Sequence, residues 1–345
     1  MVGGGNANVV SSQSVQANVN ASGIQTVASD GGTLAVMSTA ATGNSGESNI
    51  FDGGALTGTS TQTVGAFDIK ALSDYRGALA RVGGISSSTQ AVANSQGYGV
   101  EGSSAIVTAN QSSAATTQAD GGGNLTYTGG TVLFSALGTS NNVTATGDFG
   151  SAVTVNATQS MTGAHTQATV YAGAGNAQDI NAQATTTGNN ISATNSGPGA
   201  YLQVNANQTN TAFTFAEANL TSFEFGSAQA NAYGVGNSVM AGNVGQQVVL
   251  NNTQVNSGGG VEVIAGFTGD TGYDAYASAT AIGNAATGFA CSSCNGRMTV
   301  TNSQTNSAEV GATGGVAITT QGRNVSSVAS ATGNSGTFYV SSPSQ

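Results

Sequence analysis

The chain has very few charged residues. Only 6% of its 345 residues are charged, and 15 acids against 5 cations give a net charge of −10 at pH 7. Typical domains carry about 25% charged residues. Nucleic acid is a poor partner for such a chain, because phosphates need a basic surface. The balance suits a solvated surface in an outward-facing compartment.

Proline and tryptophan are also scarce, with 2 Pro and no Trp beside 52 Gly. Disorder is one interpretation of this bias, but disordered chains usually carry high charge and abundant proline. This chain has neither, and Val, Ile, Phe and Tyr recur at short intervals. We therefore expect a folded protein.

Long apolar runs are missing as well. No segment approaches the roughly 20 apolar residues that cross a membrane, so we expect no transmembrane segment. The start, "MVGGGNANVV", has neither a basic n-region nor an apolar h-region, as a signal peptide would. Either the protein is cytosolic, or it is a mature secreted chain with an added Met1. The scarcity of lysine and glutamate favours the secreted chain.

Cysteine occurs in one stretch only, "ACSSCNG", which holds Cys291 and Cys294. One CxxC supplies two zinc ligands where a structural site needs four, and the lone His165 lies far away in the sequence. We expect no metal or cofactor, and His165 is expected in an exposed loop. A local disulfide suits an oxidising compartment. A free or intermolecular thiol pair, or redox chemistry, are the alternatives.

A short stretch, "LQVNANQTN", breaks the rule for a half-buried strand. Leu202, Val204 and Ala206 alternate onto one face, which then continues with the amides Gln208 and Asn210. The pattern recurs in "ANVVSSQ", "LTGTSTQ", "AIVTANQ", "VTVNATQ", "VVLNNTQ" and "MTVTNSQ". Its closing glutamines are Gln13, Gln62, Gln111, Gln159, Gln208, Gln254 and Gln304, spaced by 49, 49, 48, 49, 46 and 50 residues. Seven units of about 49 residues therefore cover the chain, as one repeat domain over 1–345.

A second motif, rich in alanine and closed by Gly-Asn or a variant, follows in each unit. Its glycines are Gly43, Gly147, Gly188, Gly236, Gly283 and Gly333, with Gly97 as a degenerate copy. We expect these glycines in turns, because Gly tolerates left-handed backbone. The glycine comes later after the glutamine in the second and third units, which predicts insertions there.

These signals predict an all-β fold, a β-solenoid in which each unit forms two strand-turn coils of about 24 residues. Such a unit cannot bury its own thin apolar face, and stacking on its neighbours solves this. Stacked glutamines and asparagines would form ladders in which each amide donates to the next, which satisfies buried groups that otherwise cost roughly 1–3 kcal/mol each.

One stretch differs from the repeats in its charge. Residues 67–84 hold Lys70, Arg76 and Arg81, three of the 5 cations. We interpret it as an insertion that leaves the solenoid as a short helix or loop. It is either a solvated excursion or a docking element for a partner, since insertions on repeats often form binding faces.

Catalytic patterns are absent. The acids do not follow the repeat, and Asp270 with Asp274 is the nearest pair. A glycan-cleaving solenoid needs clustered acids, a catalytic triad needs more than one distant histidine, and no phosphate loop follows the glycines. We therefore expect a protein that is not an enzyme.

Several segments resemble the holdfast anchor (attachment) protein D family of stalked alphaproteobacteria. They are "TTTGNNISATNSGPG", "NAYGVGNSVMAG", "VNSGGGVEVIA" and "GYDAYASATAIGNAATGFACSSC", densest from residue 185 onward. The resemblance implies a secreted, outer-membrane-associated surface protein without catalytic residues. It also implies export through a curli-type pore, companion anchor proteins, large multimers and tethering of an adhesive polysaccharide.

Two functions follow as hypotheses. The first is a structural anchor that stacks head to tail into amyloid-like fibres and binds polysaccharide, because solenoid ends expose strand edges. The second is a monomeric glycan-binding module or polysaccharide-active enzyme. Open ends and stacked amides favour the first, and acids with aromatics in a groove would favour the second.

Overall fold

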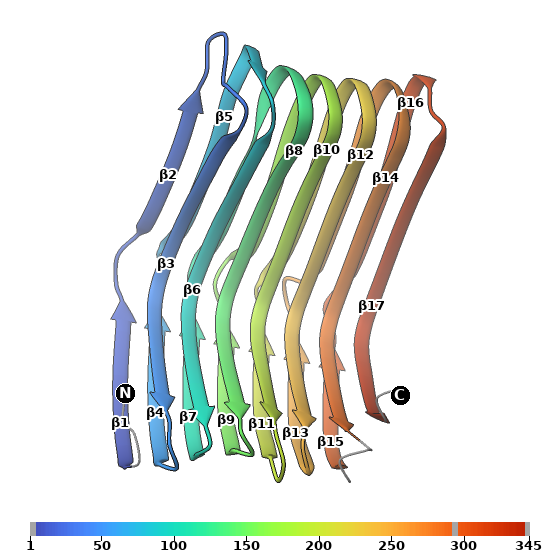
Figure 1. Cartoon of the computed structure of the whole chain (residues 1–345). Coiled ribbons are helices and arrows are strands. Elements are labelled where there is room, and N and C mark those ends of the chain that lie inside the picture. The colour runs from blue at the N-terminus through green and yellow to red at the C-terminus, as the bar shows by residue number, and fades with distance from the viewer. Residues whose placement is uncertain (1–4, 292–295, 342–345) are drawn as a thin grey trace.

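The computed structural model describes residues 5–291 and 296–341, which form a stack of β-coils (Figure 1). Every strand pairing among these residues is parallel, as in a β-solenoid, so the predicted fold class is confirmed. One sheet joins the strands that end in the repeating glutamine. In the described part of the chain these are β1 (Asn6–Val15), β4 (Ala55–Val64), β7 (Ser104–Ser113), β9 (Ala152–Met161), β11 (Tyr201–Asn210), β13 (Gln247–Asn256) and β15 (Arg297–Asn306).

The rest of each coil continues upward, turns at the top and returns as a long downward strand (Figure 1). In the middle of the stack one strand makes the whole path. These strands are β8 (Thr116–Asp148), β10 (His165–Ser196), β12 (Phe213–Val244) and β14 (Val261–Cys291). Elsewhere the path is divided into β2 (Val19–Thr26) and β3 (Ala35–Ile50), β5 (Asp68–Val82) and β6 (Ile85–Glu101), and β16 (Val310–Gln321) and β17 (Asn324–Ser341).

Each unit forms one coil, so the expectation of two coils of about 24 residues is wrong. Registered partners lie a whole unit apart, as Gln13 pairs with Gln62 and Asn189 with Asn237. The two strand segments of a unit therefore face each other across the core instead of stacking. The N- and C-termini lie at opposite ends of the stack (Figure 1).

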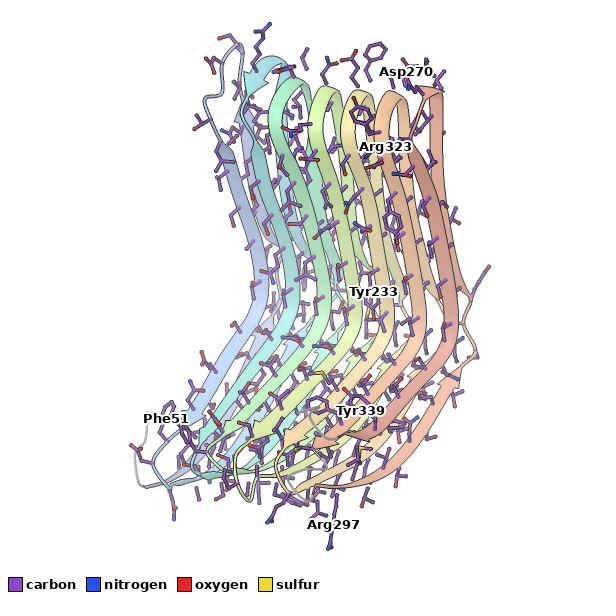
Figure 2. The ribbon with its side chains drawn as sticks, turned by 45° about the vertical axis from the view of Figure 1, so that its right-hand side comes forward. Phe51, Tyr233, Asp270, Arg297, Arg323 and Tyr339 are labelled. Carbon is purple, nitrogen blue, oxygen red and sulfur yellow. The ribbon has the colours of Figure 1, made fainter. Side chains whose placement is uncertain are left out.

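The core is narrow and rich in alanine, and it has two parts. The upper cluster includes Phe134 and Ile180, and the lower cluster includes Val155 and Leu250. Their side chains alternate with outward-facing ones, as the period of a strand requires. Both walls bend between the two clusters (Figure 2).

The charged stretch 67–84 does not leave the solenoid. Most of it is β5, which pairs with β2 on one side and β8 on the other. The register shifts only between Gly77 and Arg81, at a bulge near the top of the coil. Lys70 and Arg76 alternate outward while Ile69 and Tyr75 are buried, so the segment follows the ordinary strand pattern.

The repeating glycines lie within strands, so their predicted role in turns is wrong. The positive-φ glycines of the described residues are Gly32, Gly53, Gly102, Gly150, Gly197, Gly199, Gly258 and Gly260, a set without any of the repeating glycines. A Cβ on Gly188 would lie 2.4 Å from the carbonyl oxygen of Gly236. Glycine here permits the close approach of neighbouring coils at the bend.

The apparent insertions in the second and third units also disappear. Asn44, Asn94 and Asn141 are in register, so Ala93 and Ser140 occupy the position of the repeating glycine in those coils. Gly147 therefore belongs to a different row. The prediction of insertions is wrong because the position before the asparagine is not always Gly.

Candidate functional site

The repeating glutamines form a continuous ladder through the core. In each described pair Nε2 donates to Oε1 of the preceding coil. The distances are 2.7 Å for Gln62 to Gln13, 2.8 Å for Gln111 to Gln62, 2.8 Å for Gln159 to Gln111, 2.8 Å for Gln208 to Gln159, 2.7 Å for Gln254 to Gln208 and 2.8 Å for Gln304 to Gln254. Gln208 and Gln254 are fully buried. The predicted amide ladder is confirmed as part of the fold.

A second ladder runs along the opposite wall at the same height. Its members are Asn44, Asn94, Asn141, Asn189, Asn237, Asn284 and Asn334, and each of the first six donates to the next at 2.7–2.8 Å. The two ladders are tied together by backbone carbonyls. Gln208 donates to the carbonyl of Ser238 at 2.8 Å, and Asn237 donates to that of Val255 at 2.9 Å. The amides therefore bridge the two walls as well as the coils.

The two ladders point in opposite directions. Each glutamine donates toward the N-terminal end of the stack, whereas each asparagine donates toward the C-terminal end. At the first coil no described residue donates to Oδ1 of Asn44, and the side chain of Gln13 donates only to the carbonyl of Ser45. At the last coil the one hydrogen bond that Nδ2 of Asn334 makes to the described residues is a long contact of 3.4 Å, to the carbonyl of Gln304. Oε1 of Gln304 accepts a long contact of 3.3 Å from Asn302 of its own strand. Each end of the stack thus presents one amide donor and one amide acceptor of the two ladders, without the partner in a neighbouring coil that the inner rungs have.

The end coils also expose apolar side chains at positions that are interior elsewhere. Val9 is 37% exposed, whereas Val107, two coils away in the same row, is 0% exposed. At the other end Val325 is 53% exposed, whereas Ile180 in the same row is 1% exposed. These surfaces of the end coils are named the N-terminal end and the C-terminal end of the stack.

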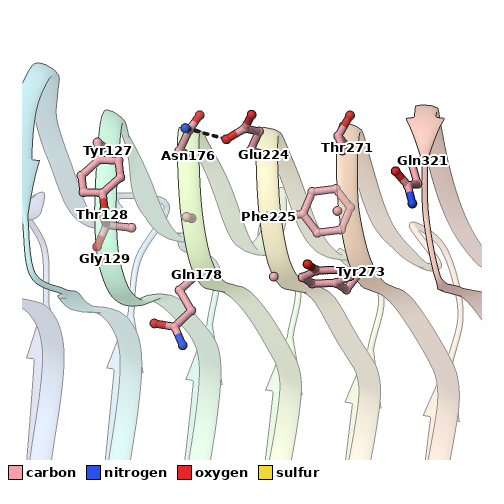
Figure 3. A pocket seen from close by; sticks show the side chains of 13 residues that line it. Tyr127, Thr128, Gly129, Asn176, Gln178, Glu224, Phe225, Thr271, Tyr273 and Gln321 are labelled. Carbon is pink, nitrogen blue, oxygen red and sulfur yellow. Dashed lines mark hydrogen bonds between the residues drawn. The ribbon is translucent and has the colours of Figure 1, made fainter.

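A shallow groove crosses the top of the stack, where the coils turn from upward to downward strands (Figure 3). It has a volume of about 540 Å³ and is named the apex groove. Its lining includes Tyr127, Asn176, Gln178, Glu224, Phe225, Tyr273 and Gln321. Asn176 donates to Glu224 at 2.8 Å. The buried Phe225 packs edge-on against Phe267, with 4.8 Å between the ring centroids.

A family model described as Holdfast attachment protein D matches residues 1–260. The chain belongs to this family. The match covers most of the chain but ends before the last of the segments that carry the resemblance. No curated protein and no solved structure matches the chain.

Membership of the holdfast attachment protein D family has coarse consequences that can be stated directly. The family implies a role in anchoring holdfast and a location at the cell surface. It is a family of structural anchor proteins and not of known enzymes. Within the described residues, no helix could cross a membrane.

The three cations of the charged stretch do not come together in this holdfast attachment family member. Lys70 pairs with Asp68 at 3.1 Å, and Arg76 pairs with Asp74 at 2.6 Å, all on the outer face of β5. Arg81 lies higher, with its Cζ 5.8 Å from the ring centroid of Tyr127. Arg81 thus contacts a residue that lines the apex groove, and the role of the stretch in docking stays a prediction.

His165 is not in an exposed loop. It is the first residue of β10 and is half-buried, because β8 and β12 pair with its strand on both sides. Burial lowers its pKa, and Lys70 adds to the effect. In the described ranges, no three His, Cys, Asp or Glu side chains stand close enough to hold a metal ion.

The acid pair Asp270 and Asp274 is engaged in structural contacts. Asp274 accepts hydrogen bonds from Arg323 at 2.5 and 3.1 Å and from Asn324 at 2.6 Å, and these contacts lower its pKa. Asp270 accepts from Thr320 at 2.7 Å. Both carboxylates thus tie the last coil to the one before it.

Cys291 ends β14 and is 6% exposed, whereas Cys294 lies outside the described residues. The disulfide between them therefore stays a prediction.

Sequence reasoning missed a further set of structural asparagines at the bottom of the stack. Asn195 donates to the carbonyls of Ser151 at 2.8 Å and Tyr201 at 2.9 Å. It therefore joins the turn that precedes β9 to the start of β11. Asn243 makes the same kind of tie to Ala200 and Gln247, each at 2.8 Å. These two asparagines are in register. Two copies are too few to stand out as a repeat in so asparagine-rich a chain.

Proposed function

We propose that the chain stacks head to tail into fibres that hold an adhesive polysaccharide, the holdfast, at the outer membrane. The observation that carries this proposal is that both amide ladders reach the end coils, where their last rungs lack the partner that a further coil would supply. In a head-to-tail stack, Gln13 of one copy would donate to Gln304 of the copy before it. Asn334 of that earlier copy would donate to Asn44 of the next. Both ladders would then continue across the junction.

The direction of the strands also distinguishes between modes of assembly. Every described coil pairs with its neighbours in parallel register, so that glutamine meets glutamine and asparagine meets asparagine. Head-to-tail stacking continues this register across the junction, whereas two N-terminal ends brought face to face would pair their strands antiparallel and interrupt both ladders. A heterologous contact that does not close into a ring generates a filament. Exposed apolar residues such as Val9 and Val325 would be buried at each junction.

The proposed partners follow from the family. Companion holdfast anchor proteins would receive or cap the fibre, and a curli-type outer-membrane pore would export the chain before it assembles. The shape suits that route, because the chain can form its coils one after another once it has left the pore. We expect no nucleic-acid partner, because a net charge of −10 repels phosphates.

The proposal is tested by sedimentation velocity and negative-stain electron microscopy of the purified chain, with and without holdfast polysaccharide. Fibres of one coil width that bind the polysaccharide are expected. A chain that stays monomeric at high concentration would overturn the stacking, and would leave the alternative of a monomeric glycan-binding module or polysaccharide-active enzyme.

Two end variants test the direction of stacking. Val9→Asp places a charge in the N-terminal end, and Val325→Asp places one in the C-terminal end. Each variant alone should fail to form fibres, and a mixture of the two should form dimers only, through the one junction that remains intact. Dimers of Val325→Asp alone would indicate face-to-face association of N-terminal ends instead. Val36→Asp is the control, because Val36 is 64% exposed and lies on the outer face of the first coil.

A further inference from the structure

The row of residues at the top of the coils differs from every ladder in the core. In register across the apex stand Arg81, Tyr127, Asn176, Glu224, Thr271 and Gln321. A row that only served stacking could repeat one residue type, as the glutamine ladder does. This row changes its chemistry from coil to coil, and it lines an open groove.

Two tyrosines stand toward opposite ends of this groove (Figure 3). Tyr127 is 45% exposed and Tyr273 is 59% exposed. Each ring has an arginine over it, with Arg81 at 5.8 Å and Arg323 at 5.2 Å from the ring centroids. Cation–π contacts of this kind hold a ring in place. The rings are therefore positioned before any ligand arrives, which reduces the entropy that binding costs.

Polar side chains fill the space between the two rings. The carboxylate of Glu224 is held by Asn176 at 2.8 Å. The amides of Gln178 and Gln321 are exposed, and no described side chain or backbone group forms a hydrogen bond with either. The groove thus offers two aromatic faces separated by amide and carboxylate groups.

We infer that the apex groove binds a linear, uncharged polysaccharide laid along the stacking axis, across the coils. Aromatic faces stack on the C–H faces of sugar rings, while amides and carboxylates bond to hydroxyl groups. Neighbouring strands lie about 4.8 Å apart, so three coil steps separate Tyr127 from Tyr273 by roughly 14 Å. That length suits a few sugar rings of an extended chain.

Charge and lining argue against other ligands. Arg81 and Arg323 flank the groove, but Arg323 is paired with Asp274 at 2.5 Å. The exposed Glu224 and the net charge of −10 oppose a polyanion such as a polyuronate. Protein partners are usually anchored by a central cluster of desolvated aromatic or apolar side chains, whereas the two exposed rings here are separated by polar groups. The inference rests on the proposed function and assigns the polysaccharide contact to a surface that is separate from the stacking ends.

The test measures binding of holdfast polysaccharide by affinity electrophoresis, with polygalacturonate as the polyanionic probe. The double variant Tyr127→Ala/Tyr273→Ala should bind the polysaccharide roughly tenfold more weakly than the wild type, since each ring contributes stacking. Gln178→Ala, at an exposed side chain without partners, should weaken binding less and cannot disturb the fold. The matched control is Tyr171→Ala/Tyr339→Ala, which removes tyrosines that are 54% and 47% exposed elsewhere on the stack.

The outcomes separate this inference from the proposed function. If the wild type assembles and binds polysaccharide while the apex double variant assembles and binds equally well, the groove assignment is wrong and the anchor function stands. If the wild type binds no polysaccharide, the proposed function itself fails. Equal or tighter binding of polygalacturonate would overturn the preference for an uncharged chain. Unchanged thermal midpoints of the variants establish that binding, and not folding, has been altered.

Discussion

The side-chain Nε2 of Gln208 lies 2.8 Å from Oε1 of Gln159, one coil earlier, in a core that excludes water from both groups. The same nitrogen donates to the carbonyl of Ser238 on the opposite wall at 2.8 Å. Gln208 thus joins neighbouring coils and facing walls at once. Polar networks in a low-dielectric core are stabilising only when every member has its partners.

Gln208→Leu should therefore destabilise the protein strongly. It removes the donor to Gln159 and to the Ser238 carbonyl, and it removes the acceptor of Gln254. Each orphaned group costs roughly 1–3 kcal/mol, so a loss of about 2–5 kcal/mol is expected after the added apolar burial. Urea unfolding measures it. Gln203→Leu on the outer face of the same strand is the control and should change stability by less than about 0.5 kcal/mol. An unchanged midpoint for Gln208→Leu would contradict the ladder's role in stability.

Asn195→Ala should loosen the bottom of the stack. Its Nδ2 supplies donors to the carbonyls of Ser151 and Tyr201, and its Oδ1 accepts from the backbone of Ser196 at 2.9 Å. A loss of about 2–4 kcal/mol is expected, with faster amide hydrogen exchange in the turn at 197–200. Asn251→Ala, which breaks an exposed rung of an outer asparagine row, serves as the comparison. Equal effects of the two substitutions would show that burial of the carbonyls does not matter.

Phe149→Gly should stabilise the protein. Phe149 has φ of 53°, in the left-handed region, which is unfavourable for a residue with a Cβ. Its side chain is 69% exposed, so burial does not compensate for the backbone strain. Glycine relieves a strain of about 1 kcal/mol there. Phe223→Gly makes the same change on a strand, at a side chain that is 61% exposed, and should be destabilising. Thermal unfolding of both variants measures the contrast, and the same sign in both would refute the strain.

Asp274 should make stability depend on acidic pH. Hydrogen bonds from Arg323 and Asn324 lower its pKa in the folded protein. A lowered folded pKa gives a contribution that is present above the unfolded pKa of about 3.9 and is lost as pH falls through the folded value. Urea midpoints of the wild type and Asp274→Asn should therefore differ at pH 6 and converge below pH 4. Arg323→Gln should show the same convergence, and a constant difference down to pH 2 would rule out this linkage.

Much of the fold follows from local patterns. The spacing of Gln13, Gln62 and their successors predicts both the repeat and the register, because a buried amide requires an identical neighbour in the next coil. The alternation in residues 202–210 predicts which side chains are buried, and Gln208 and Asn210 are indeed 0% exposed. The amides end the apolar face because the neighbouring coils satisfy them.

The apex groove and the contacts of Asn195 and Asn243 at the bottom of the stack were not predicted, for the same reason. Tyr127, Asn176 and Glu224 are different residues at unrelated offsets from any motif, and only the register of the coils places them in one row. The sequence predicts Arg81 in a separate insertion, because three of the 5 cations cluster there in a chain with few charged residues. Its strand pairs on both sides like any other.

The amino-acid sequence by itself determined the period, the β-structure and the glutamine rungs, because side-chain chemistry repeats visibly along the chain. Only the tertiary structure decided that each unit closes as one coil and that the two ladders run in opposite directions. Whether a unit closes as one coil depends on which of its strands pack against each other across the core. No pattern in the local sequence indicates that choice. Ladder direction depends on which backbone carbonyl takes the second amide hydrogen, as Ser238 does for Gln208. Every residue carries such a carbonyl, so the sequence contains no sign of it.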